Sequence, residues 1–132
     1  MTRRRSTAFY VECLLLTVFL LALTAVLAQL FSAARTQALE ARRLTDAQRL
    51  AQDISEEWYA AADETDFCQL AGVDGDGGEV TRTGPSGEDY LLRLYTIQEP
   101  ENYGRTVTLH LEVLTEERES VCSLEFVRYW PD

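Results

Sequence analysis

An apolar stretch near the N-terminus, Phe9 to Phe31, constrains this chain more than any other feature. Its one charged residue is Glu12, and the 22 residues from Cys13 to Ala34 carry no charge. At a helical rise of about 1.5 Å per residue, such a run crosses a hydrocarbon core of about 30 Å. A buried helix is disfavoured because the run is apolar on all faces and a chain of 132 residues has too little interior to surround it. The stretch therefore predicts a transmembrane helix over residues 9–34.

Basic residues precede this helix, in the cluster Arg3 to Arg5. By the positive-inside rule they predict a cytoplasmic basic leader over residues 1–8 and an extracytoplasmic C-terminal part, although Arg35, Arg42 and Arg43 reduce the contrast. A cleaved secretory signal also begins with basic residues, but its apolar region usually spans only about 7–15 residues. We therefore expect a single-pass protein of the cell membrane, with membrane lipid as a partner.

The charge of the chain is divided unevenly along the sequence. The net charge is -10, and the first 34 residues hold three arginines against Glu12, or +2, so residues 35–132 hold -12. A strongly acidic domain repels nucleic acid. We expect no nucleic-acid partner.

Beyond the apolar stretch, the sequence predicts that the helix continues. No proline or glycine occurs before Gly72, and apolar residues recur at steps of three and four, which define one helical face. We expect one helix from about Thr7 to about Ala62, ended by Asp63 to Asp66, within an amphipathic continuation over residues 35–66. The apolar stripe comprises Leu44, Ala47, Leu50, Ala51, Ile54, Trp58 and Ala61. The charged residues that fall largely off it are Arg35, Arg42, Arg43, Asp46, Arg49, Asp53, Glu56 and Glu57.

Residues 67–132 have the pattern of an extracytoplasmic antiparallel β domain. Strand-like segments with alternating apolar residues are joined by short turns, without an intervening helix, which predicts a meander. Its apolar face needs a cover, and the stripe ending at Trp58 supplies one. The predicted fold class is α+β, with a long N-terminal helix, half membrane-spanning and half amphipathic, packed on a small antiparallel β-meander. The predicted strands are Glu79 to Arg82, Tyr90 to Gln98, Arg105 to Leu114 and Val121 to Trp130.

The three cysteines fall on both sides of the predicted membrane boundary. Cys13 lies in the apolar helix and is most simply a small apolar residue there. Cys68 and Cys122 lie outside and form a candidate disulfide, closing a loop of about 54 residues in an oxidising compartment. The alternative is two separate buried thiols, because spacing alone does not show that the residues meet.

Residues suited to catalysis or metal binding are sparse. The lone histidine, His110, falls on the polar side of its predicted strand, and no serine or cysteine is placed to use it as a base. The acidic loop Asp74 to Gly78 lacks the glycine and the bidentate acid of a calcium-binding loop. We predict that the protein is not an enzyme and has no metal or cofactor.

Glu12 is the residue with the clearest functional implication. A carboxylate inside a membrane helix costs about 2.5–3.5 kcal/mol at mid-membrane and less near the edge. It either reaches the headgroup region beside Arg3 to Arg5, or it pairs with a positive group of another subunit. The residues themselves leave both alternatives open.

The N-terminal half resembles the type IV pilin and pseudopilin family. The resemblance rests on the basic leader, Phe9, Glu12, the run Cys13 to Phe31, and the amphipathic continuation Leu44 to Trp58. It implies that Glu12 is an assembly charge, which pairs with the N-terminal amine of a neighbouring subunit. It further implies that Cys68 and Cys122 correspond to a pilin C-terminal disulfide.

The family's leader ends in a glycine before the first mature residue, whereas Ala8 stands there in this chain and Glu12 is fourth from Phe9. The resemblance implies other pilin-like subunits, prepilin peptidase and pilus assembly machinery as partners, and an unprocessed protein that stays in the membrane is an alternative. We therefore expect a minor pilin-like, single-pass component of a type IV pilus-like or type II secretion-like system. The alternative is a membrane-anchored extracytoplasmic binding or sensory domain without a filament role.

Overall fold

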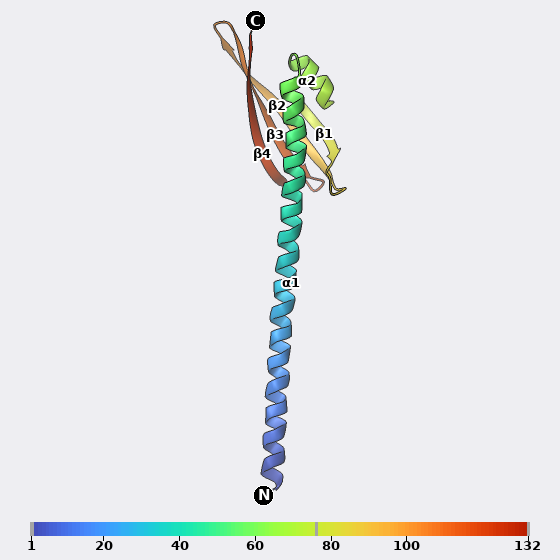
Figure 1. The fold of residues 1–132 in the computed structure, drawn as a ribbon, viewed down its shortest axis with the longest axis vertical. Coiled ribbons are helices and arrows are strands. Elements are labelled where there is room, and N and C mark those ends of the chain that lie inside the picture. Colours follow the sequence, from blue (N-terminus) through green and yellow to red (C-terminus); the bar gives the residue numbers. More distant parts are fainter. Residues whose placement is uncertain (1, 76, 132) are drawn as a thin grey trace. The chain divides into compact units, whose positions relative to one another are not determined.

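The computed structural model describes residues 2–75 and 77–131, so Asp76 of the predicted acidic loop lies outside the described residues. These residues form two compact units, one up to Glu40 and one from Ala41 onward. The structure confirms the α+β class, with a long N-terminal helix and a four-stranded antiparallel sheet (Figure 1). The elements are α1 (Thr2–Ala60), α2 (Glu64–Ala71), β1 (Gly77–Thr83), β2 (Asp89–Glu101), β3 (Gly104–Thr115) and β4 (Ser120–Pro131).

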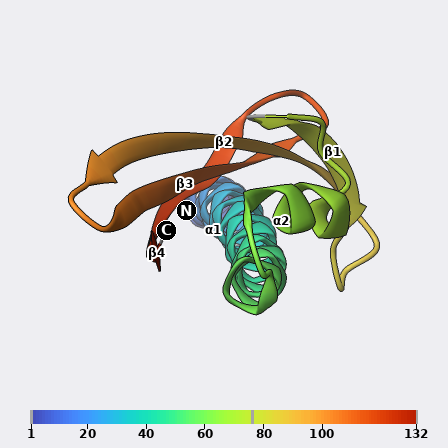
Figure 2. The same ribbon diagram turned by 90° about the horizontal axis from the view of Figure 1, so that it is seen from above.

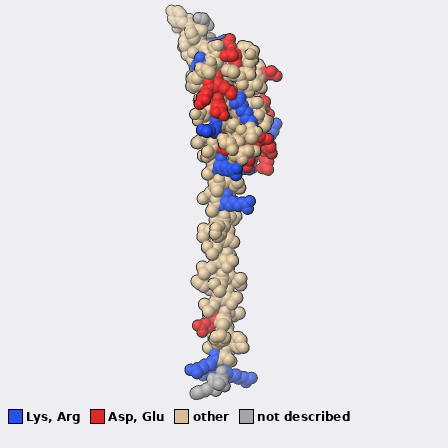
Figure 3. Space-filling model, turned by 45° about the vertical axis from the view of Figure 1, so that its right-hand side comes forward, with Lys and Arg blue, Asp and Glu red and all other residues tan. Residues whose placement is uncertain are grey.

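The first unit consists of the N-terminal part of α1, in which residues 3–40 are all exposed. Hydroxyl groups within the apolar stretch are satisfied inside the helix, since Thr17 donates to the Cys13 carbonyl and Thr24 to the Leu20 carbonyl, both at 2.8 Å. Figure 3 shows an acidic group near the basic N-terminal cluster and then a long stretch without charged atoms. Among the described residues, α1 is the one helix long and apolar enough to cross a membrane.

The sheet is the predicted meander, with strand order β1-β2-β3-β4 and every neighbouring pair antiparallel. Each strand contains its predicted segment and extends it by one to three residues at its ends. The turn between β2 and β3 is only two residues long, because Glu101 pairs with Gly104. In β3 every second side chain is apolar and buried, as the alternation predicts. These residues are Val107, Leu109, Leu111 and Val113.

The helical stripe covers this apolar face. Figure 2 shows α1 and α2 on the same side of the sheet. The predicted stripe is confirmed for Ala47, Leu50, Ala51, Ile54, Trp58 and Ala61, all of which are at most 3 % exposed. Leu44 departs from the prediction, since it is 45 % exposed, and Asp46, which we expected off the stripe, is only 3 % exposed. Asp46 is buried because it lies four residues before Leu50, on the same line of the helix as Ile54 and Trp58.

The sequence did not reveal α2, which lies beyond the predicted end of the long helix. Asp63 caps it, because its side chain accepts a hydrogen bond from the Asp66 amide at 2.7 Å, and Gly72 ends it in the left-handed conformation with φ 76°. The acidic segment therefore ends α1 at Ala60 and also begins a new helix. Phe67 of α2 packs edge-on against Trp58, with 4.8 Å between ring centroids, and so extends the cover of the sheet.

Two arginines of the sheet bind α1 directly. Arg128 of β4 donates to the carbonyls of Trp58 and Ala61 at 2.7 and 2.8 Å, which satisfies acceptors that the end of a helix leaves open. Arg82 of β1 forms a bidentate pair with Glu57, with both N–O distances at 2.9 Å. These contacts fix the end of α1 between the two edge strands.

Replacing Arg128 by methionine keeps the aliphatic stem but leaves two carbonyls at the end of α1 unsatisfied. We expect Arg128→Met to lower the free energy of unfolding by about 1.5–3 kcal/mol. Urea unfolding of the full chain in detergent micelles, followed by tryptophan fluorescence, measures this because Trp58 and Trp130 belong to the same cluster.

The matched control is Arg118→Met, in which the lost side chain is 66 % exposed and lies 3.6 Å from Glu79. A surface pair of this kind contributes at most about 1 kcal/mol. Equal unfolding midpoints for the two variants would show that Arg128 does not hold the end of α1.

Candidate functional site

Glu12 lies on the exposed surface of the first unit. It borders an apolar helix face formed by Leu15, Leu16, Val18, Phe19 and Ala22. Among the described residues, none forms a hydrogen bond or an ion pair with the Glu12 carboxylate. In a hydrocarbon environment, such a carboxylate requires water, a headgroup or a positive group from another molecule.

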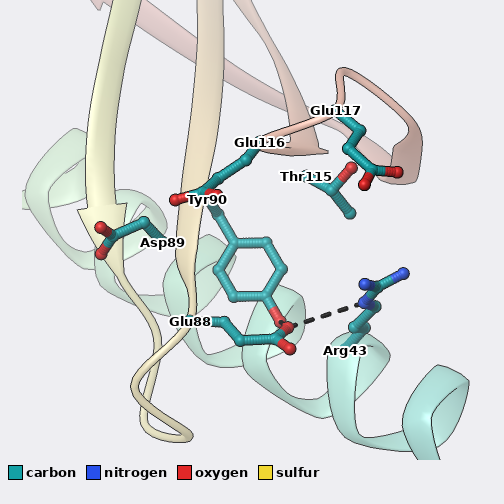
Figure 4. Close-up of a pocket in the computed structure, with 7 residues that line it drawn as sticks. All are labelled: Arg43, Glu88, Asp89, Tyr90, Thr115, Glu116 and Glu117. Atoms are coloured by element: carbon teal, nitrogen blue, oxygen red, sulfur yellow. Dashed lines mark hydrogen bonds and ion pairs between the residues drawn. The ribbon is translucent and has the colours of Figure 1, made fainter.

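A second candidate site is a polar cleft in the sheet domain (Figure 4). It brings together three segments: α1 through Arg43, the start of β2 with the loop before it, and the end of β3 with the turn after it. In Figure 4 the Tyr90 ring points between Glu88 and Arg43. The lining residues are Arg43, Glu88, Asp89, Tyr90, Thr115, Glu116 and Glu117.

The Tyr90 hydroxyl lies behind this cleft and meets two carboxylates. It is 3.0 Å from Asp46 and 3.1 Å from Glu88, and Ser86 also donates a hydrogen bond to Asp46. Burial, followed by the hydrogen bonds to Asp46 and Glu88, raises the pKa of Tyr90 well above its usual value of about 10. The Tyr90 hydroxyl therefore keeps its proton and acts as a hydrogen-bond donor to these carboxylates.

Backbone geometry allows this close approach. A Cβ at Gly84 would lie 2.9 Å from both the Asp46 carboxylate and the Tyr90 ring, so a larger residue would separate them. Arg42 adds a hydrogen bond to the Ser86 carbonyl at 3.0 Å, and Arg43 lies 3.6 Å from Glu88. The contacts of Asp46, Arg42 and Arg43 hold the loop between β1 and β2 against α1. This cluster around Asp46 therefore stabilises the fold.

One feature of the sequence indicates that Asp46 is buried, although its charge argues against burial. Asp46 stands four residues before Leu50 and eight before Ile54, so its spacing fits the buried stripe. Its partners Ser86 and Tyr90 lie 40 and 44 residues away, and no local pattern predicts that separation.

The candidate disulfide between Cys68 and Cys122 is absent from the structure. Cys122 is a thiol on β4 opposite Val113, whereas Cys68 lies on α2. The Cys68 thiol instead donates to the carbonyl of Gly75, two residues before β1, at 2.9 Å.

His110 lies on the sheet face that we predicted, opposite the helices. It stacks on Tyr95, with ring centroids 4.6 Å apart at an angle of 8°, and its Nδ1 is 3.0 Å from Glu125. No cluster of three or more metal-ligating side chains occurs in residues 2–75 and 77–131. The contacts of His110 are those of a cross-strand row on a sheet surface.

Comparisons with known proteins found no relative of this chain. No family model matches the sequence, and no curated protein and no solved structure matches it.

Replacing Tyr90 by phenylalanine removes the hydroxyl that binds Asp46 and Glu88. We expect Tyr90→Phe to lower the free energy of unfolding by about 1–3 kcal/mol at pH 7, because the buried Asp46 carboxylate loses a hydrogen-bond donor. The pKa of Tyr90 is raised in the folded state, so the unfolded chain ionises first as pH rises above about 10, and the stability from this group is lost there. The difference between wild type and variant should therefore shrink above pH 10.

Urea unfolding from pH 7 to pH 11 measures this difference. Tyr59→Phe is the control, because Tyr59 is 54 % exposed and its loss should change little at any pH. A Tyr90→Phe effect that stays constant across this pH range would contradict the proposed ionisation.

The Cys122 thiol is half-buried, and burial raises its pKa. Since the thiolate is the reactive form, we expect native Cys122 to react slowly with iodoacetamide at pH 8 and rapidly once the chain is unfolded in urea without a reductant. Peptide mapping by mass spectrometry assigns the labelled site. Labelling of unfolded Cys122 only after reduction would show that it is bridged.

Proposed function

We propose that this chain is a minor pilin-like, single-pass membrane protein that assembles with other pilin-like subunits through the N-terminal part of α1. The observation that carries the proposal is Glu12, a lone carboxylate on an exposed apolar helix segment. The same helix continues into a stretch that covers a small antiparallel sheet. A spanning helix combined with such a domain is the architecture that the family resemblance implies.

In this proposal the N-terminus is cytoplasmic and the sheet domain is extracytoplasmic. The cluster Arg3 to Arg5 favours this orientation under the positive-inside rule. The segment Cys13 to Ala34 lies in the bilayer, and the acidic domain from Ala41 onward lies in water, where its charges are solvated.

Assembly depends on helix packing and on one charge pair. Apolar helices gain little from leaving lipid for one another, so a polar contact selects the partner and the register. Glu12 supplies that contact by pairing with a positive group of a neighbouring subunit. In the family this group is an N-terminal amine, and in an unprocessed chain the Arg3 to Arg5 cluster of a neighbour carries the positive charge.

Processing by prepilin peptidase separates two versions of the proposal. A mature protein that begins near Phe9 is a processed subunit, whereas one that keeps Arg3 to Arg5 is a permanent membrane protein. Determining the N-terminal residue of the protein purified from its own membrane distinguishes these forms.

Replacing Glu12 by glutamine removes the charge and preserves the size of the side chain. We expect Glu12→Gln to weaken association of the N-terminal helices by about threefold or more, because polar contacts between membrane helices contribute about 0.6–1.7 kcal/mol. Energy transfer between differently labelled copies, and between this chain and co-expressed pilin-like subunits, measures association in membranes.

Thr24→Val is the matched control, because it alters another polar side chain of the same segment. The Thr24 hydroxyl bonds to its own helix at Leu20, so its loss should leave association unchanged. Undiminished association of Glu12→Gln, with normal membrane insertion, would refute the assembly role and favour a membrane-anchored binding domain.

A further inference from the structure

The outer face of the sheet, opposite α1 and α2, carries an exposed group of aromatic and aliphatic side chains near the turn between β2 and β3. The strand register makes the group continuous, since Ile97 and Val127 flank Thr108 of β3 in one row, and Glu99 and Tyr129 flank Thr106 in the next. Contiguous apolar groups of this kind are a mark of binding surfaces, unlike single exposed residues. The group, here named the outer-face patch, comprises Tyr95 (47 % exposed), Ile97 (47 %), Tyr103 (83 %), Val127 (56 %) and Tyr129 (46 %).

Two tyrosines of the outer-face patch are held in position. The Tyr129 hydroxyl donates a hydrogen bond to the Tyr103 carbonyl at 2.8 Å. The hydroxyl lies close to Gly104, where a Cβ atom would be only 2.7 Å from the hydroxyl oxygen. Tyr95 is stacked on His110 at 4.6 Å. A partner that binds these rings therefore immobilises side chains that are already ordered, which reduces the entropic cost of binding.

Carboxylates border the outer-face patch, and one of them, Glu125, already lies 3.0 Å from His110 Nδ1. The bordering residues are Glu99 and Glu101 of β2 and Glu125 of β4, and Glu99 is exposed. Arg93 is the nearest basic residue on this face along β2, and it already bridges Glu79 at 3.1 Å and Glu112 at 3.2 Å. Carboxylates beside exposed tyrosine rings favour binding of a guanidinium or ammonium group. Such a cation forms an ion pair with a carboxylate and a cation–π contact with a tyrosine ring.

We propose that the outer-face patch docks a partner protein segment in which arginine or lysine side chains alternate with apolar ones. Other occupants fit these charges less well. An anionic lipid surface is repelled by the three glutamates, and the same face of a second copy would place glutamates opposite glutamates. This surface lies on residues far in sequence from Glu12, so the inference does not depend on the assembly proposed for α1.

The test uses the full chain in phosphatidylcholine nanodiscs, labelled with 3-fluorotyrosine, whose resonances are assigned by single tyrosine-to-phenylalanine variants. The probes are two peptides of equal length, one alternating arginine with leucine and the other alternating glutamate with leucine. We expect the arginine peptide to shift the resonances of Tyr95, Tyr103 and Tyr129. The resonance of Tyr59, which is exposed on α1, should stay in place, and the glutamate peptide should have no effect.

Substitutions in the outer-face patch separate specific docking from general charge attraction. The double variant Ile97→Ser with Val127→Ser should weaken binding of the arginine peptide by at least about fivefold, as expected for central contact residues. Leu70→Ser is the control, because Leu70 is 51 % exposed on α2 and lies outside the patch. Glu99→Gln should also weaken binding and reduce its dependence on salt.

Three outcomes would overturn the proposal. They are equal effects of the two peptides, no shift at the three patch tyrosines, or unchanged affinity in the double variant. A shift of the patch resonances with protein concentration alone would assign the surface to a second copy of this chain instead.

Discussion

The fold of the sheet domain depends on the packing of the last turns of α1 against the sheet. Trp58 is fully buried, contacts Phe67 of α2 and Trp130 of β4 edge-on at 4.8 Å each, and so joins three elements in one aromatic cluster. Burying an aromatic side chain of this size contributes several kcal/mol, and the paired rings add to it. Arg128 completes the arrangement, because it binds the carbonyls beside the cluster and lies 5.0 Å over the Trp130 ring.

This arrangement divides α1 between two kinds of surroundings. Up to Glu40 its side chains are exposed and mostly apolar, and from Asp46 onward one face is buried against the sheet. The change occurs over a few residues that contain Arg42 and Arg43, both of which contact the loop between β1 and β2. The core cluster of the domain is made of residues from Ala47 onward, so the apolar side chains up to Glu40 stay exposed.

The sequence predicted the features that depend on local periodicity and missed those that depend on distant partners. Alternation in β3 and the steps of three and four from Ala47 to Ala61 identified the buried residues of these two elements, because burial imposes these spacings along the chain. The Asp46 cluster was missed, since its partners come from another element. The candidate disulfide is absent from the structure, and the sequence missed this for a related reason, because spacing along the chain gave no indication of where α2 would hold Cys68 relative to Cys122 on β4. The segment Asp63 to Asp66 was recognised as a helix end, but Asp63 also accepts a hydrogen bond from the Asp66 amide in the first turn of α2, and Asp66 accepts one from the Ala62 amide.

The contact between Arg128 and the Trp58 carbonyl joins residues 70 positions apart, and it places part of the core on β4, the last strand described. Loop closure over such a distance is slow compared with formation of the helix or of the hairpins. The domain consequently lacks a complete core until β4 is in place, because that strand supplies Trp130 and Arg128. During synthesis from the N-terminal end, the apolar stripe of α1 thus waits for residues far along the chain before its cover is complete.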